Sequence, residues 1–280
     1  MSAQTSFVQL PGRLKIEYVE QGRSDGIPVV CLHGLTDSWF SFTPVLPYLR
    51  DSLRVFAVSQ RGHGNSDRPD TGFSPSDFAD DVAAFLDAME IKRAVIVGHS
   101  MGSFMAQRFA LDYPQRTAGV VLIGSFRTLG GKPWAMQFLE DVSRLTDPVP
   151  PSFAREFQES TIKRPVPREF LETVVNESLK LPARVWKQAL KQGHIDPDHS
   201  EELPSLTAPT LLVWGDQDAL MDRAEQHFLA ANIPNSRLLI YEGIGHAVHW
   251  EAPQRFARDL MEFIGRLGSA GAEQGFRKRA

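Results

Sequence analysis

The feature that most constrains the fold of this chain is a G-x-S-x-G pentapeptide, Gly98-His99-Ser100-Met101-Gly102. An apolar, β-branched run precedes it at residues 94–97, and a helical pattern follows it at residues 103–113. The pattern predicts a strand that passes into a helix through one sharp turn, with Ser100 at the tip. The flanking glycines leave room where a Cβ would clash, and the N-terminus of the helix presents free N–H groups to an anion.

Two polar segments follow later strands of the sequence. Residues 210–214 are typical of a buried strand, and Gly215-Asp216-Gln217-Asp218 comes directly after them. Residues 237–241 predict the next strand, which leads to Gly245-His246. A serine hydroxyl needs a base and an acid that orients the base, and open parallel sheets collect reactive groups beyond the carboxyl ends of their strands. The order Ser, Asp, His along the chain fits that requirement.

With these segments the chain resembles the α/β-hydrolase family from about residue 14 to about residue 265. The matching segments are His33-Gly34-Leu35, Arg61-Gly62-His63-Gly64-Asn65-Ser66, the serine pentapeptide, Gly215-Asp216-Gln217-Asp218, and Gly245-His246 with Glu251-Ala252-Pro253. The resemblance implies Ser100 as nucleophile, His246 as base and Asp218 as orienting acid. It also implies an oxyanion hole made by the backbone N–H groups of Leu35 and Met101.

Two positions depart from the family pattern. The family usually reads D-x-R-G-x-G, and Ser59 stands where that Asp is expected. Because that Asp is generally a scaffold residue, we expect no effect on the chemistry. Ser103 stands where many relatives have a third glycine, and we expect it to alter the packing behind the turn.

Strand and helix patterns alternate along most of the chain, which predicts an α/β fold with a mostly parallel sheet and helices on both faces. Residues 14–19 predict an antiparallel edge strand. The clearest predicted helix is 76–89, with Ser76 as its cap, and the last one is 252–267. The other predicted strands are residues 29–32, 54–58, 94–97, 119–123, 210–214 and 237–241.

No strand pattern occurs between residues 126 and 203, where prolines interrupt helical patterns. We interpret this stretch as a helical cap over the sheet; the alternative is an elongated helical connection at its side. The predicted organisation is an α/β-hydrolase core in residues 1–125 and 204–267, a cap in residues 126–203, and a flexible tail in residues 268–280.

Several residues compete with the assigned ones. His249 is a rival to His246 as base, and Asp216 is a rival to Asp218 as acid, although the G-x-x-D register favours Asp218. The remaining histidines of the motifs are expected to hold loops, His33 through hydrogen bonds. His194 and His199 lie close to two aspartates but lack metal-ligand spacing, so we interpret them as part of a solvated polar loop.

Composition excludes several classes of protein. A net charge of −4 gives no reason to expect nucleic acid or an anionic membrane as partner. Cys31 is the one cysteine, which rules out a disulfide within the chain, and it lies in an apolar run typical of a buried strand. No secretory signal or membrane span is evident, so we expect a reducing cytoplasm. No metal or other cofactor is expected, and the oligomeric state is open.

The chemistry expected from these residues is hydrolysis of a carboxylic ester through an acyl-enzyme. Lactones, C–C bonds and perhydrolysis remain alternatives, as does a small-molecule receptor that retains the triad. The predicted cap is rich in aromatic residues and its charges are of both signs, which favours small neutral apolar esters. Trp134, Phe138 and Trp186 are the candidate substrate-binding residues.

Overall fold

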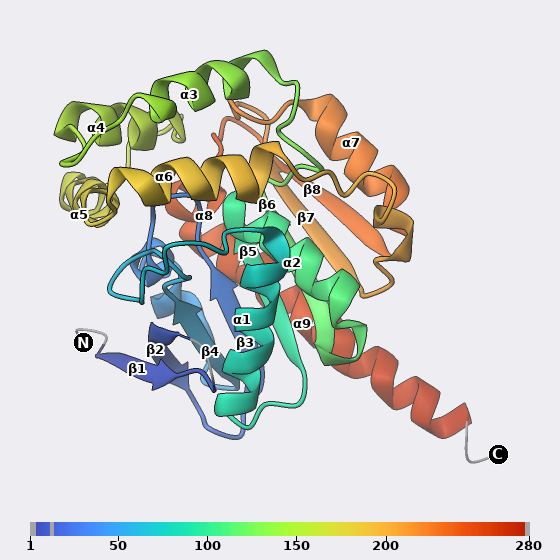
Figure 1. Cartoon of the computed structure of the whole chain (residues 1–280). Coiled ribbons are helices and arrows are strands. Elements are labelled where there is room, and N and C mark those ends of the chain that lie inside the picture. The colour runs from blue at the N-terminus through green and yellow to red at the C-terminus, as the bar shows by residue number, and fades with distance from the viewer. Residues whose placement is uncertain (1–3, 12–13, 278–280) are drawn as a thin grey trace.

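The computed structural model describes residues 4–11 and 14–277. Its centre is an eight-stranded sheet in the order β1-β2-β4-β3-β5-β6-β7-β8 (Figure 1). β2 is antiparallel to β1 and β4, and all other neighbours pair in parallel, as the alternating pattern predicts. The strands are β1 (Thr5–Gln9), β2 (Lys15–Gly22), β3 (Ile27–Leu32), β4 (Leu53–Val58), β5 (Ala94–His99), β6 (Thr117–Ile123), β7 (Thr210–Gly215) and β8 (Ser236–Tyr241).

The six other predicted strands are all present, but the prediction that residues 14–19 form an edge strand is wrong. Residues 14–19 belong to β2, which lies second in the sheet, because β1 pairs along its outer side. Sequence patterning missed β1 because four of its five residues are exposed, so it has no apolar face to detect.

Helices cover both faces of the sheet (Figure 1). One apolar core forms between the sheet and α1 (Pro75–Ala88), α2 (Met101–Asp112) and α7 (Arg223–Asn232). The other core forms between the opposite face and α8 (Val248–Glu251), α9 (Pro253–Arg277) and two 3₁₀ turns, Trp39–Phe42 and Leu46–Tyr48. Further 3₁₀ turns lie at Pro114–Arg116 and Leu203–Ser205.

Two helix ends differ from the prediction. Ser74 caps α1 instead of Ser76: its hydroxyl accepts from the Asp77 N–H, and the Asp77 carboxylate accepts from the Ser74 N–H. α9 continues to Arg277, ten residues into the predicted flexible tail, because good helix formers separate the glycines there. Residues 278–280 lie outside the described part of the chain.

Four helices between β6 and β7 form a separate layer (Figure 1), which we call the cap: α3 (Pro133–Ser143), α4 (Pro151–Ser160), α5 (Arg168–Leu179) and α6 (Ala183–Leu190), followed by one π-helical turn at Lys191–Ile195. No strand occurs in residues 124–209, all of which the structure describes. Prolines begin or immediately precede all four helices, since proline is suited to a first turn that needs no N–H donor.

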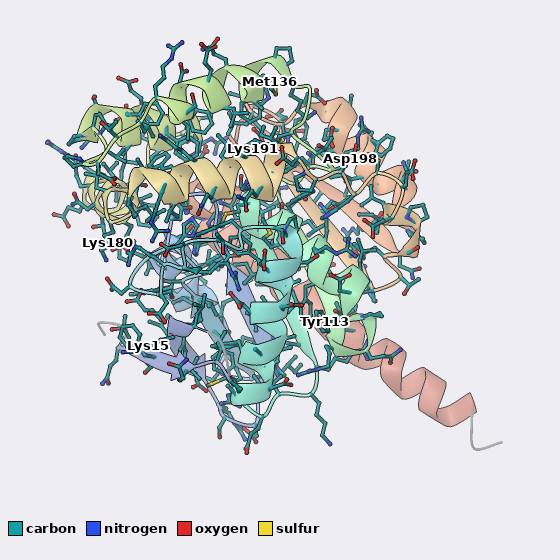
Figure 2. All side chains as sticks on the ribbon, viewed as in Figure 1. Lys15, Tyr113, Met136, Lys180, Lys191 and Asp198 are labelled. Carbon is teal, nitrogen blue, oxygen red and sulfur yellow. The ribbon has the colours of Figure 1, made fainter. Side chains whose placement is uncertain are left out.

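The cap rests on loops at the carboxyl ends of the strands. Gln158 of α4 bonds to Asp37, which follows β3, and Arg184 of α6 bonds to the carbonyl groups of Arg68 and Pro69, in the loop after β4. The cap also has an outer face, where Met136 of α3 is 43% exposed (Figure 2). The assignment of the cap as a domain of its own stays a prediction.

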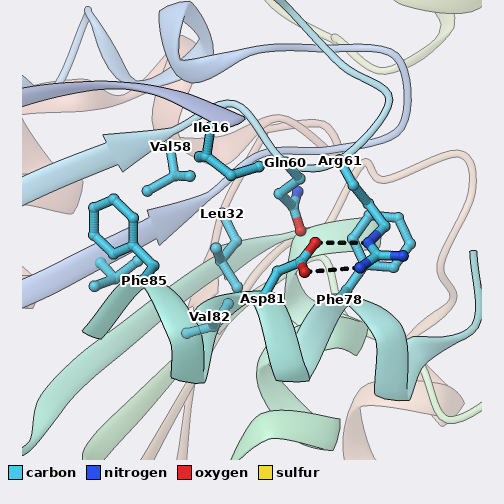
Figure 3. Close-up of a pocket in the computed structure, with 10 residues that line it drawn as sticks. Ile16, Leu32, Val58, Gln60, Arg61, Phe78, Asp81, Val82 and Phe85 are labelled. Carbon is cyan, nitrogen blue, oxygen red and sulfur yellow. Dashed lines mark hydrogen bonds and ion pairs between the residues drawn. The ribbon is translucent and has the colours of Figure 1, made fainter. Parts of the chain in front are cut away.

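A buried ion pair anchors the Arg-Gly-x-Gly segment after β4. The Arg61 guanidinium makes two parallel bonds to the Asp81 carboxylate of α1, at 2.6 and 2.7 Å, beside a small cavity of about 20 Å³ (Figure 3). Arg61 also donates to the carbonyl of Gly72. This arginine therefore ties the loop to the first helix and is not free for a ligand.

A carboxylate from β2 lies against Ser59, the first departure from the family pattern. Glu17 is 1% exposed, and its Oε2 accepts from the Ser59 hydroxyl at 2.9 Å and from the Asn65 N–H at 2.9 Å. Its Oε1 accepts from the Asn65 amide at 2.6 Å, and the Ser59 hydroxyl accepts from the Trp39 N–H. A buried carboxyl group from β2 therefore lies beside position 59, where the family pattern has an Asp.

Candidate active site

Ser100 occupies a strained turn between β5 and α2. Its φ is 50° and its ψ is −115°, a conformation that residues with a side chain rarely adopt. The backbone segments at this turn lie too close together for a side chain at position 98 or 102. A Cβ on Gly98 would lie 2.2 Å from the carbonyl oxygen of Gly102, and a Cβ on Gly102 would lie 2.1 Å from the carbonyl oxygen of Leu32. The chain therefore folds at this turn as the G-x-S-x-G spacing predicts.

His246 and Asp218 form a buried pair. Nδ1 of His246 lies 2.7 Å from Oδ2 of Asp218, and Oδ1 of Asp218 accepts from the N–H groups of Leu220 and Met221 at 2.8 and 2.9 Å. The two backbone N–H groups therefore hold the carboxylate through one oxygen, and the other oxygen orients the imidazole of His246. Nε2 of His246 is buried without a hydrogen-bond partner among the described residues, which leaves it available to a proton from another group.

The imidazole of His246 lies next to the serine turn. Its ring centroid is 5.0 Å from that of His99, the residue directly before Ser100. The Ser100 N–H donates to the carbonyl of Ile123, at the end of the neighbouring strand β6. The loops that carry the three predicted triad residues thus meet at one edge of the sheet.

The rival residues have other partners. Asp216 accepts from the Gly243 N–H at 2.6 Å and holds the turn after β8. Nε2 of His249 lies 3.0 Å from the hydroxyl of Ser41, and burial lowers the pKa of His249 to about 3. Neither residue contacts the His246–Asp218 pair through a hydrogen bond.

The loop after β3 places Leu35 beside the serine turn. The Gln60 N–H donates to Nε2 of His33, so Nδ1 of His33 carries the proton and donates to the carbonyl of Gly34 at 2.7 Å. The carbonyl of His33 accepts from Gly102 at 3.0 Å, which joins this loop to the start of α2. His33 thus holds the loop by hydrogen bonds, as expected.

The two predicted oxyanion donors are not used elsewhere. Within residues 4–11 and 14–277, neither the Leu35 nor the Met101 N–H donates a hydrogen bond. Met101 is the first residue of α2, where N–H groups have no partner within the helix. Both groups are therefore available to a ligand oxygen.

Ser103, the second departure from the family pattern, belongs to a buried polar chain behind the turn. Its hydroxyl bonds to the carbonyl of Ser100 at 2.6 Å and to the hydroxyl of Ser125 at 2.9 Å. The amide of Gln107 donates to Ser125, and that of Gln226 on α7 donates to the Ser125 carbonyl. Ser103 therefore stabilises the turn at Ser100 through side-chain hydrogen bonds that a glycine could not make.

The predicted polar loop around His194 and His199 is wrong. Both histidines are buried: His194 lies against Phe104 and Phe126, and His199 stacks on Phe104 with their ring centroids 3.9 Å apart. Nδ1 of His194 bonds to the carbonyl of Ala189, whereas Asp196 and Asp198 are exposed. The sequence could not separate the histidines from the aspartates, because buried and exposed residues in this irregular segment follow neither the helical nor the strand period. In the part of the chain that the structure describes, no three His, Cys, Asp or Glu side chains are placed to share a metal ion.

An aromatic cavity opens between α3 and α4 and reaches Leu220, next to the site. Predicted binding residues Trp134 and Phe138 both line it, together with Asp141, Phe153, Glu156, Phe157, Ser160 and Leu220. Trp186 does not line it: it is fully buried under Phe153 and Phe157 and packs edge-on against both rings. Its place is in the core of the cap.

A family model for the alpha/beta hydrolase fold matches residues 27–253, which include every segment of the site. The chain belongs to the α/β-hydrolase family. It is a hydrolase by this membership and by its relatives. None of the helices within the described ranges has the length and hydropathy to cross a membrane.

Three proteins illustrate the relatives of this α/β-hydrolase. A 2-hydroxy-6-oxononadienedioate/2-hydroxy-6-oxononatrienedioate hydrolase of Burkholderia vietnamiensis is 30% identical over 90% of the chain and 92% of its own length. A non-heme chloroperoxidase of Streptomyces lividans is 28% identical over 89% and 95%. The crystal structure of an esterase from Rhodococcus sp. ECU1013 aligns with a TM-score of 0.82 at 28% identity, covering 95% of this chain and all of that one.

Sequence reasoning missed several residues that support the site of the hydrolase. Asp37, Ser41 and Gln158 form a buried network beside the Leu35 loop, and Gln107 and Gln226 complete the one behind Ser100. The sequence signal that could have found some of them is a polar residue within an apolar helical pattern, as for Gln107 in α2. The partners lie up to 121 positions apart, so nothing local indicated the pairing.

Buried histidines make the stability of this α/β-hydrolase sensitive to acid. Burial is the largest cause that lowers the pKa of six of them: well below the usual value for His33 and His99, to about 4 for His63 and His194, and to about 3 for His199 and His249. The unfolded chain binds these protons near about pH 6.5, so it is favoured below that pH. Asp37 acts in the opposite sense, because burial raises its pKa to about 7.

We expect the free energy of unfolding to fall steeply as the pH is lowered from about 6.5 toward 4, by up to about 1.4 kcal/mol per pH unit for each such histidine. Six groups outweigh the single opposing one. Urea unfolding followed by circular dichroism at several pH values measures this. A free energy that stays constant between pH 6.5 and 5 would contradict the assignment of these histidines as neutral.

Proposed function

We propose that the chain hydrolyses carboxylic esters through an acyl-enzyme on Ser100. The Ser100 hydroxyl attacks the ester carbonyl while Nε2 of His246 takes its proton, and Asp218 stabilises the imidazolium that forms. The N–H groups of Leu35 and Met101 stabilise the oxyanion of the tetrahedral intermediate. His246 then protonates the departing alkoxide, and a water that gives its proton to His246 releases the acid.

One observation carries this proposal above all. The buried His246–Asp218 pair leaves Nε2 unpartnered beside the strained turn that presents Ser100, with two unused N–H groups close by. Steady turnover of p-nitrophenyl butyrate, together with covalent labelling of Ser100 by a fluorophosphonate, tests it. A single burst of product without sustained turnover would favour a receptor, and labelling of another residue would overturn the assignment of the nucleophile.

The relatives suggest other reactions that should be compared with ester hydrolysis. The Burkholderia protein is named for a dicarboxylate substrate, the Streptomyces protein for peroxidase chemistry, and the Rhodococcus structure for an esterase. C–C bond, lactone and peroxide reactions can start from the same triad. A panel of an ester, a lactone, a ring-fission product and an ester with peroxide ranks them by kcat/KM.

The aromatic cavity supports neutral, apolar esters as the substrate class. Four aromatic side chains line it, and its two charged side chains, Asp141 and Glu156, are both acidic. Neither carboxylate forms an ion pair with a described residue. The cavity therefore offers apolar contact and repels a second carboxylate on a substrate.

We expect kcat/KM for a neutral butyrate ester to exceed that for a dicarboxylate half-ester of similar length by about fivefold. The reason is that repulsion between the substrate carboxylate and one carboxylate of the cavity, both close to water, costs about 1 kcal/mol. The combined variant Asp141→Asn with Glu156→Gln should narrow this difference. Glu140→Gln, on the same helix α3 but outside the cavity, is the control. A tenfold preference of the wild-type protein for the half-ester would overturn the substrate class.

A further inference from the structure

A buried glutamine of the cap, Gln158, contacts the loop after β3 that carries Leu35. Gln158 of α4 is 1% exposed. Its amide nitrogen lies 2.9 Å from Oδ1 of Asp37, 2.9 Å from the hydroxyl of Ser178 on α5, and 3.2 Å from the hydroxyl of Thr36. An amide nitrogen carries two hydrogens, so these three acceptors fully engage it. Thr36 and Asp37 are the two residues directly after Leu35.

The segment that Gln158 holds is strained. Thr36 has a φ of 66°, and a β-branched residue at positive φ is a true outlier. Such a conformation persists only where surrounding contacts impose it. The Asp37 N–H donates to the carbonyl of Gly34 at 3.2 Å, which closes the turn around Leu35 and Thr36. The direction of the Leu35 N–H depends on this turn.

Asp37 is the point through which the glutamine acts. It is 2% exposed, and no Lys or Arg among the described residues forms an ion pair with it. Its Oδ2 accepts from the Ser41 hydroxyl at a long 3.3 Å, so the Gln158 amide at 2.9 Å is the shorter of its side-chain donors. A buried carboxyl that loses such a donor is costly to keep in place.

We infer that Gln158 is a positioning residue for the oxyanion hole, because it clamps the Thr36–Asp37 turn and thereby fixes the Leu35 N–H. This inference rests on the proposed ester hydrolysis. It makes the cap a part of the catalytic geometry: α4 and α5 must be docked on the core for the loop after β3 to hold its strained form. The cap then contributes to the rate as well as to the shape of the pocket.

Gln158→Met tests the inference, since methionine keeps the length of the side chain and removes the amide. The loss of one oxyanion donor costs about 10²–10³ in kcat in a comparable enzyme, so displacement of the loop should lower kcat by about tenfold or more. KM should stay within about twofold, because the oxyanion forms only in the transition state. The inhibition constant of an aryl trifluoromethyl ketone, whose adduct carries the same oxyanion, should rise by the same factor as kcat falls.

Glu159→Gln is the matched control, because it changes the next, exposed residue of α4 and should leave all three constants unchanged. If Gln158→Met does not fold, Ser178→Ala is measured instead: it removes a hydrogen-bond partner of both the Gln158 amide and the Thr36 hydroxyl, and it should lower kcat by a few-fold with KM unchanged. An unchanged kcat in the variant used, a change in KM alone, or an unchanged affinity for the ketone would overturn the inference. A wild-type protein that turns over no ester would instead overturn the proposed function, and this inference with it.

Discussion

The Ser100→Ala variant is expected to lose kcat by on the order of 10⁶ with p-nitrophenyl butyrate, as loss of a triad nucleophile does in a comparable enzyme. Without the hydroxyl, His246 has no proton to take and no acyl-enzyme forms. The free energy of unfolding should change little, since alanine differs from serine by one atom at this turn. Steady-state rates and urea unfolding of the purified variant measure both effects.

Ser103→Ala is the matched control for this loss. Ser103 lies one turn further along α2 and bonds to the carbonyl of Ser100. Loss of its hydroxyl removes this hydrogen bond but leaves the proposed nucleophile in place. It should retain far more activity than Ser100→Ala. If the Ser100 variant keeps more than a tenth of the wild-type rate, another residue must be the nucleophile.

Asp218→Asn should lower kcat by about 10⁴, the size of the effect in a serine protease with the same arrangement. An asparagine amide at this position donates to Nδ1 of His246 and so places the proton on Nε2, which then cannot accept one from Ser100. The Leu220 and Met221 N–H groups can still bond to the amide oxygen, so the loop should keep its form. The kcat of p-nitrophenyl butyrate hydrolysis measures the effect.

Asp216→Asn is the control that separates the orienting role of Asp218 from a general effect of substitutions in this loop on kcat. Asp216 belongs to the same segment and accepts from the Gly243 N–H, but it does not bond to His246. Its amide oxygen can still accept that bond, so kcat should fall by less than about tenfold. Equal losses in the two variants would count against Asp218 as the orienting acid.

Local sequence patterns predicted most of the fold. Buried parallel strands are short apolar runs, and the glycines around Ser100 mark a crossing that excludes side chains, so both have strong local signals. The helical cap could be inferred from the loss of strand patterns. β1 was missed because its exposed residues show no apolar face, and the length of α9 was missed because glycines near its end suggested a flexible tail.

The core of the site followed from motif register, whereas its supports did not. Family register placed Asp218 opposite His246, and the structure puts the two side chains in contact. Gln158 lies on a helix whose sequence shows no sign of its partner, because that partner is set by how the cap docks on the core. Trp186 was chosen as an aromatic residue of the cap, and only packing could show that it is buried beneath the cavity.

The acid on β2 beside Ser59 bears on how such a site can change over time. Glu17 and Ser59 are 42 positions apart in the sequence, yet their side chains are in contact. An aspartate at position 59, as the family pattern has it, would lie beside the Glu17 carboxyl group, and loss of that carboxyl group alone would leave the Asn65 donors without their acceptor. Either single change should therefore cost stability, and the two changes together should cost less than the sum of the single ones.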